Sequence, residues 1–150
     1  MDTKKNFCYD YARPAVACDN LIVSKHNNSV EILLIQRKGE PCAGMWALPG
    51  GFLEENETAE EGAARELLEE TGVKISADKL ILVSIFSKPN RDPRTHLISL
   101  SYLAYVDKNI IEHKAGDDAS NTAWHDLNNL PEMAFDHAEI IESAKRKKLL

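Results

Sequence analysis

Three glutamates, Glu66, Glu69 and Glu70, have the residue type and the spacing that metal-dependent chemistry requires. On a helix with 3.6 residues per turn, their side chains fall within an arc of about 100°. Like charges at this spacing repel one another. A hard divalent cation such as magnesium, which takes oxygen ligands and leaves room for substrate phosphates, would relieve that repulsion. For the helix considered alone, a solvated acidic face is the commoner explanation.

The flanking residues predict the helix that carries these glutamates. Thr58 and Glu61 have the spacing of a capping box, which marks a helix start, and Gly72 can take the left-handed conformation that ends a helix. Arg65 can reach Glu69 one turn away, yet residues 54–70 contain eight acidic residues and one basic residue. The opposite face is expected to pack on a core and comprises Ala63, Ala64, Leu67, Leu68 and Thr71.

The segment at residues 51–73, GFLEENETAEEGAARELLEETGV, also matches a known signature in fixed register. Its nine specified positions are Gly51, Glu57, Arg65, Glu66, Leu67, Glu69, Glu70, Gly72 and Val73. The chain therefore resembles the Nudix hydrolases, which cleave nucleoside diphosphates linked to another moiety and use magnesium or manganese. The resemblance implies an α+β fold, an α/β/α sandwich with a central mixed sheet between helices. It also makes a merely solvated acidic face a poor explanation.

Metal ligation is the role that the resemblance implies for Glu66, Glu69 and Glu70, with the last two the firmest ligands. Glu57 is expected to join a second metal or to support the ligands of the first. Gly50 is a further candidate, because a glycine backbone can approach a ligand closely and offer its carbonyl oxygen to a metal. A tight turn is the simpler reading of that glycine.

Catalysis needs a base that takes or orients the proton of the attacking water. By the resemblance, this base is either a glutamate of the signature, such as Glu66 or Glu69, or an acidic residue on a distant loop. Asp117 and Asp118 are the distant candidates, and a pair of solvated loop aspartates is the alternative. Arg65 is expected to orient a glutamate rather than to contact substrate.

Four further segments resemble the ADP-ribose pyrophosphatase branch of the family. They are RPAV (13–16), GMWALPGGF (44–52), RDPR (91–94) and AFDHAEII (134–141). The branch cleaves ADP-ribose to AMP and ribose 5-phosphate, so the same reaction is expected here. His137, in the last segment, is interpreted as a hydrogen-bonding residue at a helix terminus rather than a catalyst.

Arginines are the expected substrate-binding residues, because a guanidinium forms forked hydrogen bonds to phosphate or ribose oxygens. Arg91 and Arg94 lie in the proline-punctuated loop, and Arg13 and Arg37 are the other candidates. An aromatic ring, Trp46 or Phe86, could stack on adenine, although a core position is favoured for both.

Two other functions remain open at this point. One is a hydrolase of oxidised nucleoside triphosphates such as 8-oxo-dGTP, related to MutT, with the same chemistry on another substrate. The other is a non-catalytic domain that senses ADP-ribose, as in regulators in which a Nudix-like domain is fused to a DNA-binding winged helix. The complete signature and the end of the chain at Leu150 favour an enzyme over such a regulator.

The remaining pattern predicts the elements that position these residues in one domain spanning residues 1–150. Strands are expected at 15–23 (two strands, or one bent strand), 31–37, 79–87 and 96–106, with a short strand from 123 and a terminal amphipathic helix at 135–147. The apolar run Ile32–Ile35 predicts a strand covered on both faces. Strands interspersed with two helices indicate a layered α+β domain.

Composition narrows the function classes. A net charge of −6 disfavours nucleic-acid binding but not a nucleotide substrate, because bound cations invert the local charge. Cys8, Cys18 and Cys42 are scattered, which predicts free thiols in a cytoplasmic protein. A signal peptide and a membrane-spanning run are both absent from the sequence. A homodimer is expected because related enzymes often pair.

Overall fold

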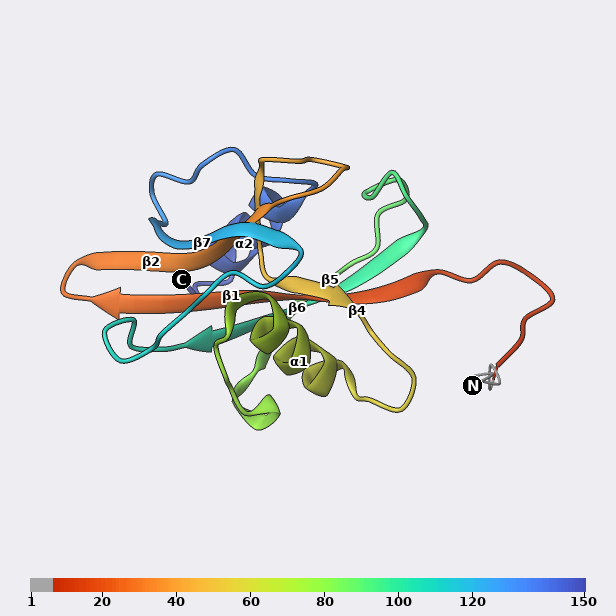
Figure 1. The fold of residues 1–150 in the computed structure, drawn as a ribbon, viewed down its shortest axis with the longest axis horizontal. Coiled ribbons are helices and arrows are strands. Elements are labelled where there is room, and N and C mark those ends of the chain that lie inside the picture. Colours follow the sequence, from red (N-terminus) through yellow and green to blue (C-terminus); the bar gives the residue numbers. More distant parts are fainter. Residues whose placement is uncertain (1–6) are drawn as a thin grey trace.

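A computed structural model describes residues 7–150, which form a mixed seven-stranded sheet between two helices (Figure 1). The sheet order is β3-β2-β1-β6-β5, with β4 paired to β1 and β7 paired to β2. The strands are β1 (Ala15–His26), β2 (Ser29–Arg37), β3 (Trp46–Ala47), β4 (Gly50–Phe52), β5 (Ile81–Phe86), β6 (Leu97–Tyr105) and β7 (Ala119–Asp126). The helices are α1 (Ala59–Thr71), α2 (His137–Arg146) and the 3₁₀ turn η1 (Ala77–Lys79). The expected α+β sandwich is confirmed.

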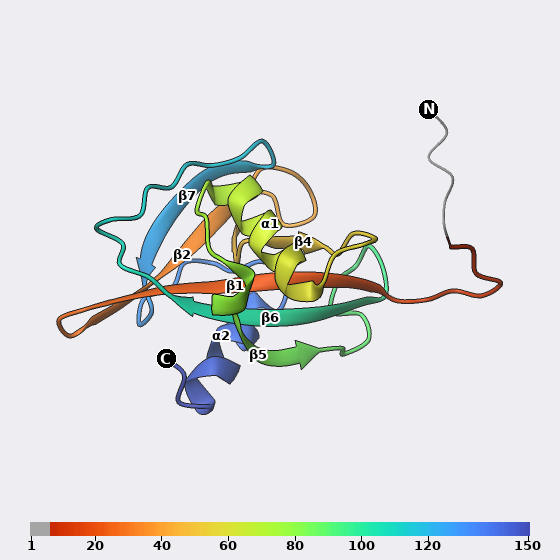
Figure 2. The same cartoon turned by 90° about the horizontal axis from the view of Figure 1, so that it is seen from below.

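The two helices cover opposite faces of the sheet (Figure 2). Leu33 packs in the cluster beneath α1, whereas Ile32 and Leu34 pack in the cluster beneath α2. All three side chains are fully buried, which confirms that this apolar run forms a strand covered on both faces. Strand β1 pairs in parallel with β6 over residues 15–23, and residues 15–19 lead to the candidate active site.

Helix α1 begins and ends as its sequence predicts. Thr58 accepts a hydrogen bond from the Glu61 amide at 3.2 Å, and the Glu61 carboxylate accepts one from the Thr58 amide at 2.8 Å. Gly72 closes the helix with a φ of 72°, a conformation that costs glycine little. Leu67 is fully buried, but the inward position predicted for Leu68 is wrong, since its side chain is 45% exposed. Leu68 lies about 100° around the helix from Leu67, beyond the face that contacts the sheet.

Some element boundaries also differ from the prediction. Residues 15–26 form one continuous strand, because β1 pairs along its length with β2, β4 and β6. Strand β7 begins at Ala119 rather than at residue 123, since it pairs with β2 as far as Arg37. Helix α2 begins after Phe135, whose φ of 50° is incompatible with a right-handed helix.

The structure also describes the three cysteines and the lengths of the helices. Cys8, Cys18 and Cys42 are free cysteines. Within residues 7–150, neither helix has the length and apolar character needed to cross a bilayer.

Leu67 and Leu68 provide a matched test of how α1 packs. We expect Leu67→Ala to lower the free energy of unfolding by about 2–5 kcal/mol, because it leaves a cavity under the helix. Leu68→Ala is expected to cost less than about 1 kcal/mol because its side chain is half exposed. Urea unfolding of both variants measures the difference, and equal losses would contradict this orientation of α1.

Candidate active site

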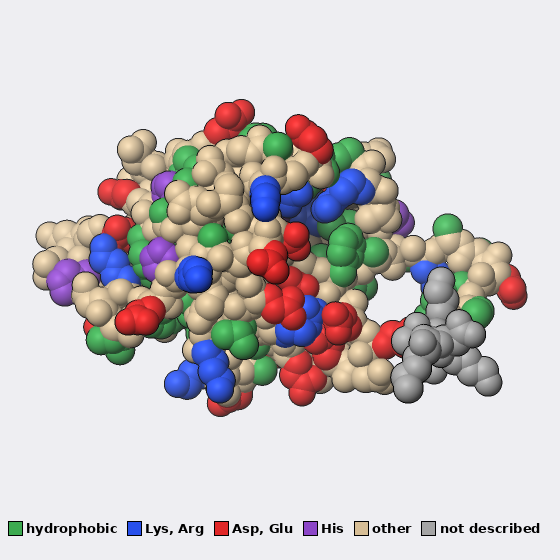
Figure 3. Space-filling view, viewed as in Figure 1, with side chains coloured by type: hydrophobic (Ala, Val, Ile, Leu, Met, Phe, Trp, Pro, Cys, Tyr) green, Lys and Arg blue, Asp and Glu red, His purple; other side chains and the backbone are tan. Residues whose placement is uncertain are grey.

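Arg65 organises the acidic face of α1. Its guanidinium donates to both carboxylate oxygens of Glu57 at 2.7 and 2.9 Å, to Glu66 at 2.8 Å and to Glu69 at 3.3 Å. A fifth hydrogen bond, at 3.0 Å, reaches the carbonyl oxygen of Phe52 in β4. Arg65 therefore ties the acidic helix to the sheet, and Figure 3 shows the acidic side chains gathered around basic ones on this face.

These contacts and the burial of the side chains shift the pKa values of the carboxylates in different directions. The forked pair with Arg65 lowers the pKa of Glu57, and the same pair raises the pKa of Arg65. Burial raises the pKa of Glu66, although Arg65 opposes this effect. Burial also raises the pKa of Glu70 to about 8, because the single amide that bonds it, the Gly50 N–H at 2.8 Å, compensates only in part.

The glycines before α1 allow the sheet and the helix to come this close. A Cβ atom on Gly51 would lie 2.4–2.6 Å from the carboxylate atoms of Glu66, and one on Gly50 would lie 2.1 Å from the carbonyl oxygen of Cys18. Neither φ is positive, so close approach rather than backbone conformation requires glycine at both positions. A tight turn that needs a positive φ therefore does not account for either glycine.

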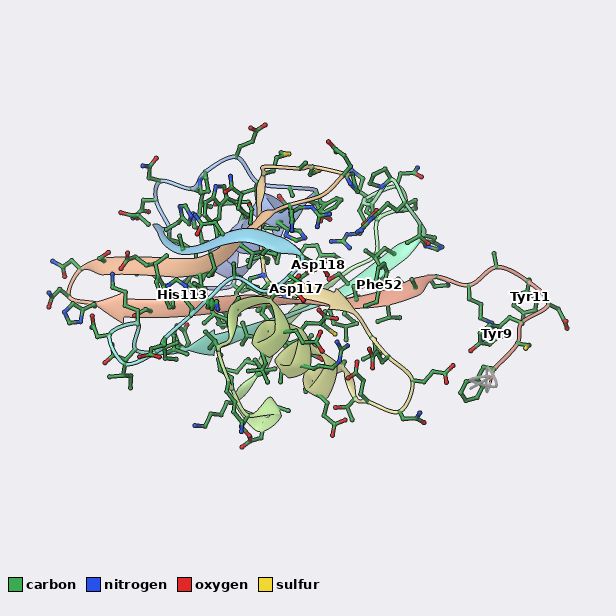
Figure 4. The ribbon with its side chains drawn as sticks, viewed as in Figure 1. Tyr9, Tyr11, Phe52, His113, Asp117 and Asp118 are labelled. Carbon is green, nitrogen blue, oxygen red and sulfur yellow. The ribbon has the colours of Figure 1, made fainter. Side chains whose placement is uncertain are left out.

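The loop before β7 brings two further carboxylates to the same place. Lys114 and Gly116 donate backbone hydrogen bonds to the carbonyl oxygens of Thr71 and Glu70, at 2.7 and 2.9 Å. His113 packs edge-on against Trp124, with ring centroids 6.3 Å apart. Asp117 and Asp118 consequently lie beside the end of α1 (Figure 4). They share a cavity of about 310 Å³ whose complete lining is Glu66, Glu69, Glu70, Asp117 and Asp118.

The donor atoms around this cavity are carboxylate oxygens, the ligand type that magnesium and manganese prefer. Within residues 7–150, no three His, Cys, Asp or Glu side chains already converge as a metal site. Arg65 holds Glu57, Glu66 and Glu69, so a cation would have to draw carboxylates away from the guanidinium. The residues fit a hard cation by their chemistry, and Gly50 borders the larger cavity that contains Glu66 and Glu70.

A second cavity, which we call the arginine–phenylalanine pocket, adjoins the acidic one. Arg37 and Arg94 lie over the ring of Phe135, at 5.0 and 5.3 Å from its centroid, and Arg94 also lies 5.9 Å from the ring of Phe52. Asp92 orients Arg94 through hydrogen bonds of 2.7 and 3.0 Å, and Arg94 in turn lowers the pKa of Asp92. The larger cavity connects the two. It shares Ile35, Arg37, Gly50, Gly51, Phe52, Glu70 and Arg94 with the arginine–phenylalanine pocket, and Glu66, Glu70, Asp117 and Asp118 with the acidic cavity.

The expected substrate-binding residues divide into two groups. Arg37 and Arg94 lie in the pocket. Arg91 also lines it, but its side chain is only 3% exposed and makes a forked ion pair with Asp136 at 2.6 and 2.8 Å, so its Nε and Nη2 atoms are already engaged. Substrate binding by Arg91 stays a prediction.

Two other expected residues lie outside the pocket. Arg13 stacks on Tyr9 and Tyr11, 4.0 and 5.1 Å from their centroids, in a segment that leads away from the sheet (Figures 1 and 4). Trp46 packs edge-on against His125 at 4.3 Å and lines neither cavity, as the favoured core position implies. Phe86, like Trp46, packs against the hydrophobic cluster beneath α2.

Phe52 and Phe135 are the aromatic residues of the pocket, and sequence reasoning did not single them out. Their segments had been noticed, since Phe52 follows the two glycines and Phe135 lies in AFDH. The positive φ of Phe135, which turns the chain just before α2, is not apparent from the residue type.

Known proteins are similar to this chain in sequence and fold. A family model of the NUDIX domain matches residues 13–144. The ADP-ribose pyrophosphatase of Methanocaldococcus jannaschii is 48% identical over 138 residues, covering 92% of this chain and 77% of that protein. The ADPR responsive transcriptional repressor NtrR of Acinetobacter baylyi is 32% identical over 139 residues, covering 90% of this chain and 54% of the repressor. The chain thus spans about half the length of that repressor.

One solved structure is especially relevant to the pocket. The NUDIX domain of Shewanella oneidensis NrtR, in a cocrystal with ADP ribose, matches with a TM-score of 0.83 at 27% identity. The match covers 93% of this chain and 91% of that domain.

Glu70 makes the stability of the metal-free protein depend on pH. Its folded-state pKa of about 8 exceeds the ordinary value of 4.5, so the folded state binds more protons between these values and stability falls as pH rises. We expect the parent to lose about 1 kcal/mol or more between pH 5 and pH 8 in EDTA.

Glu70→Gln should remove this loss, because glutamine keeps an oxygen for the Gly50 N–H but has no proton to release. The exposed Glu55→Gln change is the control and should keep the parent's slope. Urea unfolding at a series of pH values measures all three proteins. Equal slopes for parent and Glu70→Gln would refute the assignment.

Proposed function

Since the chain belongs to the NUDIX domain family of hydrolases, we propose that it hydrolyses ADP-ribose to AMP and ribose 5-phosphate with magnesium or manganese. The observation that carries this proposal is the junction of two cavities. One is lined by Glu66, Glu69, Glu70 and the Asp117–Asp118 pair, the other contains paired arginines over Phe135, and the larger cavity connects them. A diphosphate with an organic group at each end matches a carboxylate-lined cavity that opens into a basic, aromatic one.

The carboxylates supply the metal-binding part of the reaction. Glu66, Glu69 and Glu70 would hold the cation, with Glu57 and the Gly50 carbonyl as additional support. The bound cation neutralises phosphate oxygens and lowers the pKa of a bound water. In this scheme Arg65 keeps Glu57 and Glu66 oriented through its hydrogen bonds.

Asp118 is the favoured base, with Asp117 beside it, because both exposed side chains lie at the wall of the acidic cavity. A carboxylate there can take or orient the proton of the attacking water. Arg37 and Arg94 would bind phosphate or ribose oxygens, and the faces of Phe52 and Phe135 are suited to the adenine ring. Glu66 and Glu69 are the alternative bases if the aspartates prove dispensable.

ADP-ribose is favoured over other nucleotides by the named relatives. Both a pyrophosphatase and a repressor that respond to this compound, by their names, align with nine tenths of the chain. The similarity to the repressor supports ADP-ribose binding whether the chain is an enzyme or a sensor. The complete set of glutamates favours turnover over sensing alone.

Assembly and location are finer proposals. Strand β5 is an edge strand with half-exposed Ile81, Leu82 and Ile85, and such an edge can pair with a second copy. We propose a homodimer, whose mass sedimentation velocity would reveal. The free cysteines favour a reducing compartment, the cytoplasm.

The function is tested with purified protein, magnesium and a substrate panel. The parent is expected to release AMP from ADP-ribose with a higher kcat/KM than it shows for 8-oxo-dGTP. Glu69→Gln combined with Glu70→Gln should lower kcat by about a hundredfold or more, since it removes metal ligands. The exposed Glu55→Gln change should leave kcat unaltered. Binding of ADP-ribose without turnover by the parent would instead identify a sensor.

The aspartate pair is tested separately. Asp117→Asn with Asp118→Asn should lower kcat at least about tenfold, because general-base catalysis typically contributes that much or more. Glu112→Gln, an exposed change in the same loop, is the control. Unchanged turnover in the double variant would remove both aspartates from the mechanism and leave the base among the glutamates.

A further inference from the structure

Two nearly buried polar side chains lie at the floor of the arginine–phenylalanine pocket. Asp19 of β1 is 6% exposed and His137 of α2 is 7% exposed, and both line the pocket together with Arg37 and Phe135. Asp19 alternates along β1 with Leu21 and Val23, which pack beneath α2, and His137 lies in α2 itself, whereas the acidic helix covers the other face of the sheet (Figure 2). The reaction scheme above uses neither of them.

His137 has one nitrogen engaged and one free. Its Nδ1 accepts a hydrogen bond from the Leu48 amide at 3.0 Å, so this nitrogen bears no proton. Burial lowers the pKa of His137, which favours the neutral ring. The single proton of a neutral imidazole then lies on Nε2, and no hydrogen bond from Nε2 is formed within residues 7–150. His137 thus presents an N–H donor.

Asp19 has the complementary arrangement. Its Oδ2 accepts a hydrogen bond from the Ser99 hydroxyl. Its Oδ1 lies 3.6 Å from Nε2 of His137, which is too long for a direct hydrogen bond. A Cβ atom on residue 50 would lie 2.8 Å from Oδ1, so the absence of a side chain at Gly50 keeps space beside this oxygen. Asp19 thus presents a free acceptor next to the free donor of His137.

A group that both donates and accepts satisfies this pair. A phosphate oxygen only accepts and would be repelled by the carboxylate, and a cationic group only donates and would meet the His137 N–H unfavourably. One hydroxyl oxygen at about 2.8 Å from both atoms can accept from Nε2–H and donate to Oδ1. In a nucleotide, a single oxygen atom that both donates and accepts in this way is that of a ribose hydroxyl.

We propose that Asp19 and His137 form a specificity-determining pair that binds a ribose hydroxyl of the nucleotide. This inference rests on the proposed function and deepens it by naming the part of the substrate that the floor of the pocket recognises. The substrate offers two sources, the adenosine ribose and the terminal ribose. Arg37 and Arg94 engage charge, whereas this pair recognises a neutral group.

Substitutions can remove one partner while keeping the packing. His137→Asn retains a side-chain oxygen near the position of Nδ1, which can accept from the Leu48 amide, but lacks Nε2. Asp19→Asn is isosteric and can still accept from Ser99, while its amide replaces the free acceptor with a donor. Glu139→Gln, an exposed change in the same helix, is the control.

Binding is measured by calorimetry in EDTA with ADP-ribose, its 2′,3′-dideoxyadenosine analogue, and ADP, which lacks the terminal ribose. The parent and Glu139→Gln should bind ADP-ribose about tenfold to a hundredfold more tightly than the ligand that lacks the recognised hydroxyl, as a hydrogen bond to a charged group predicts. Which ligand is weaker identifies the ribose. Asp19→Asn and His137→Asn should bind ADP-ribose as weakly as that ligand.

Each other outcome overturns one proposal. Removing the Asp19 charge should tighten binding of all three anionic ligands if charge alone matters, and that result, or equal weakening for all three, would overturn the pair. Equal binding of all three ligands by the parent would show that no ribose hydroxyl occupies the site and would overturn the pair. A parent that cleaves ADP-ribose but does not bind it in EDTA would overturn the inference alone. A parent that neither cleaves nor binds it would overturn the proposed function.

Discussion

The mutual repulsion of the carboxylates on α1 is the constraint around which this molecule is built. Arg65 relieves it by hydrogen-bonding Glu66 and Glu69 of the helix, together with Glu57 just before it, and fastens the helix to β4 through the Phe52 carbonyl. Glu70, which Arg65 does not contact, takes the Gly50 amide instead. A cation at the acidic face would therefore compete with Arg65 and the Gly50 amide for these carboxylate oxygens.

Opposite faces of one sheet contribute different parts of the site. The α1 face supplies the carboxylates, and the α2 face supplies the arginines, the aromatic rings and the Asp19–His137 pair. They meet at β4, where glycines allow backbone and side chains from both layers to approach closely. In the proposed function, phosphate chemistry and nucleotide recognition would therefore occupy neighbouring spaces of one site.

Local sequence rules predicted the parts of this structure that local interactions determine. The capping box of Thr58, the Gly72 stop and the doubly covered β2 all follow from spacing and residue type. Leu68 was misplaced because helix periodicity does not reveal how wide a face the sheet covers. The ion pair of Arg91 was not predicted because its partner, Asp136, lies 45 residues away in sequence. Phe135 depends on a backbone turn, and the Asp19–His137 pair on tertiary contacts, so neither had a signal in the sequence.

The backbone bonds from Lys114 and Gly116 to the last carbonyl groups of α1 have a consequence for dynamics. Helix ends normally fray because their final carbonyls lack partners within the helix. Here those partners come from the loop that holds Asp117 and Asp118, and a Cβ atom on Gly116 would lie 2.2 Å from the Glu69 carbonyl oxygen. Fraying of α1 and detachment of the loop are therefore one cooperative opening event, and amide hydrogen exchange at the two segments should rise and fall together.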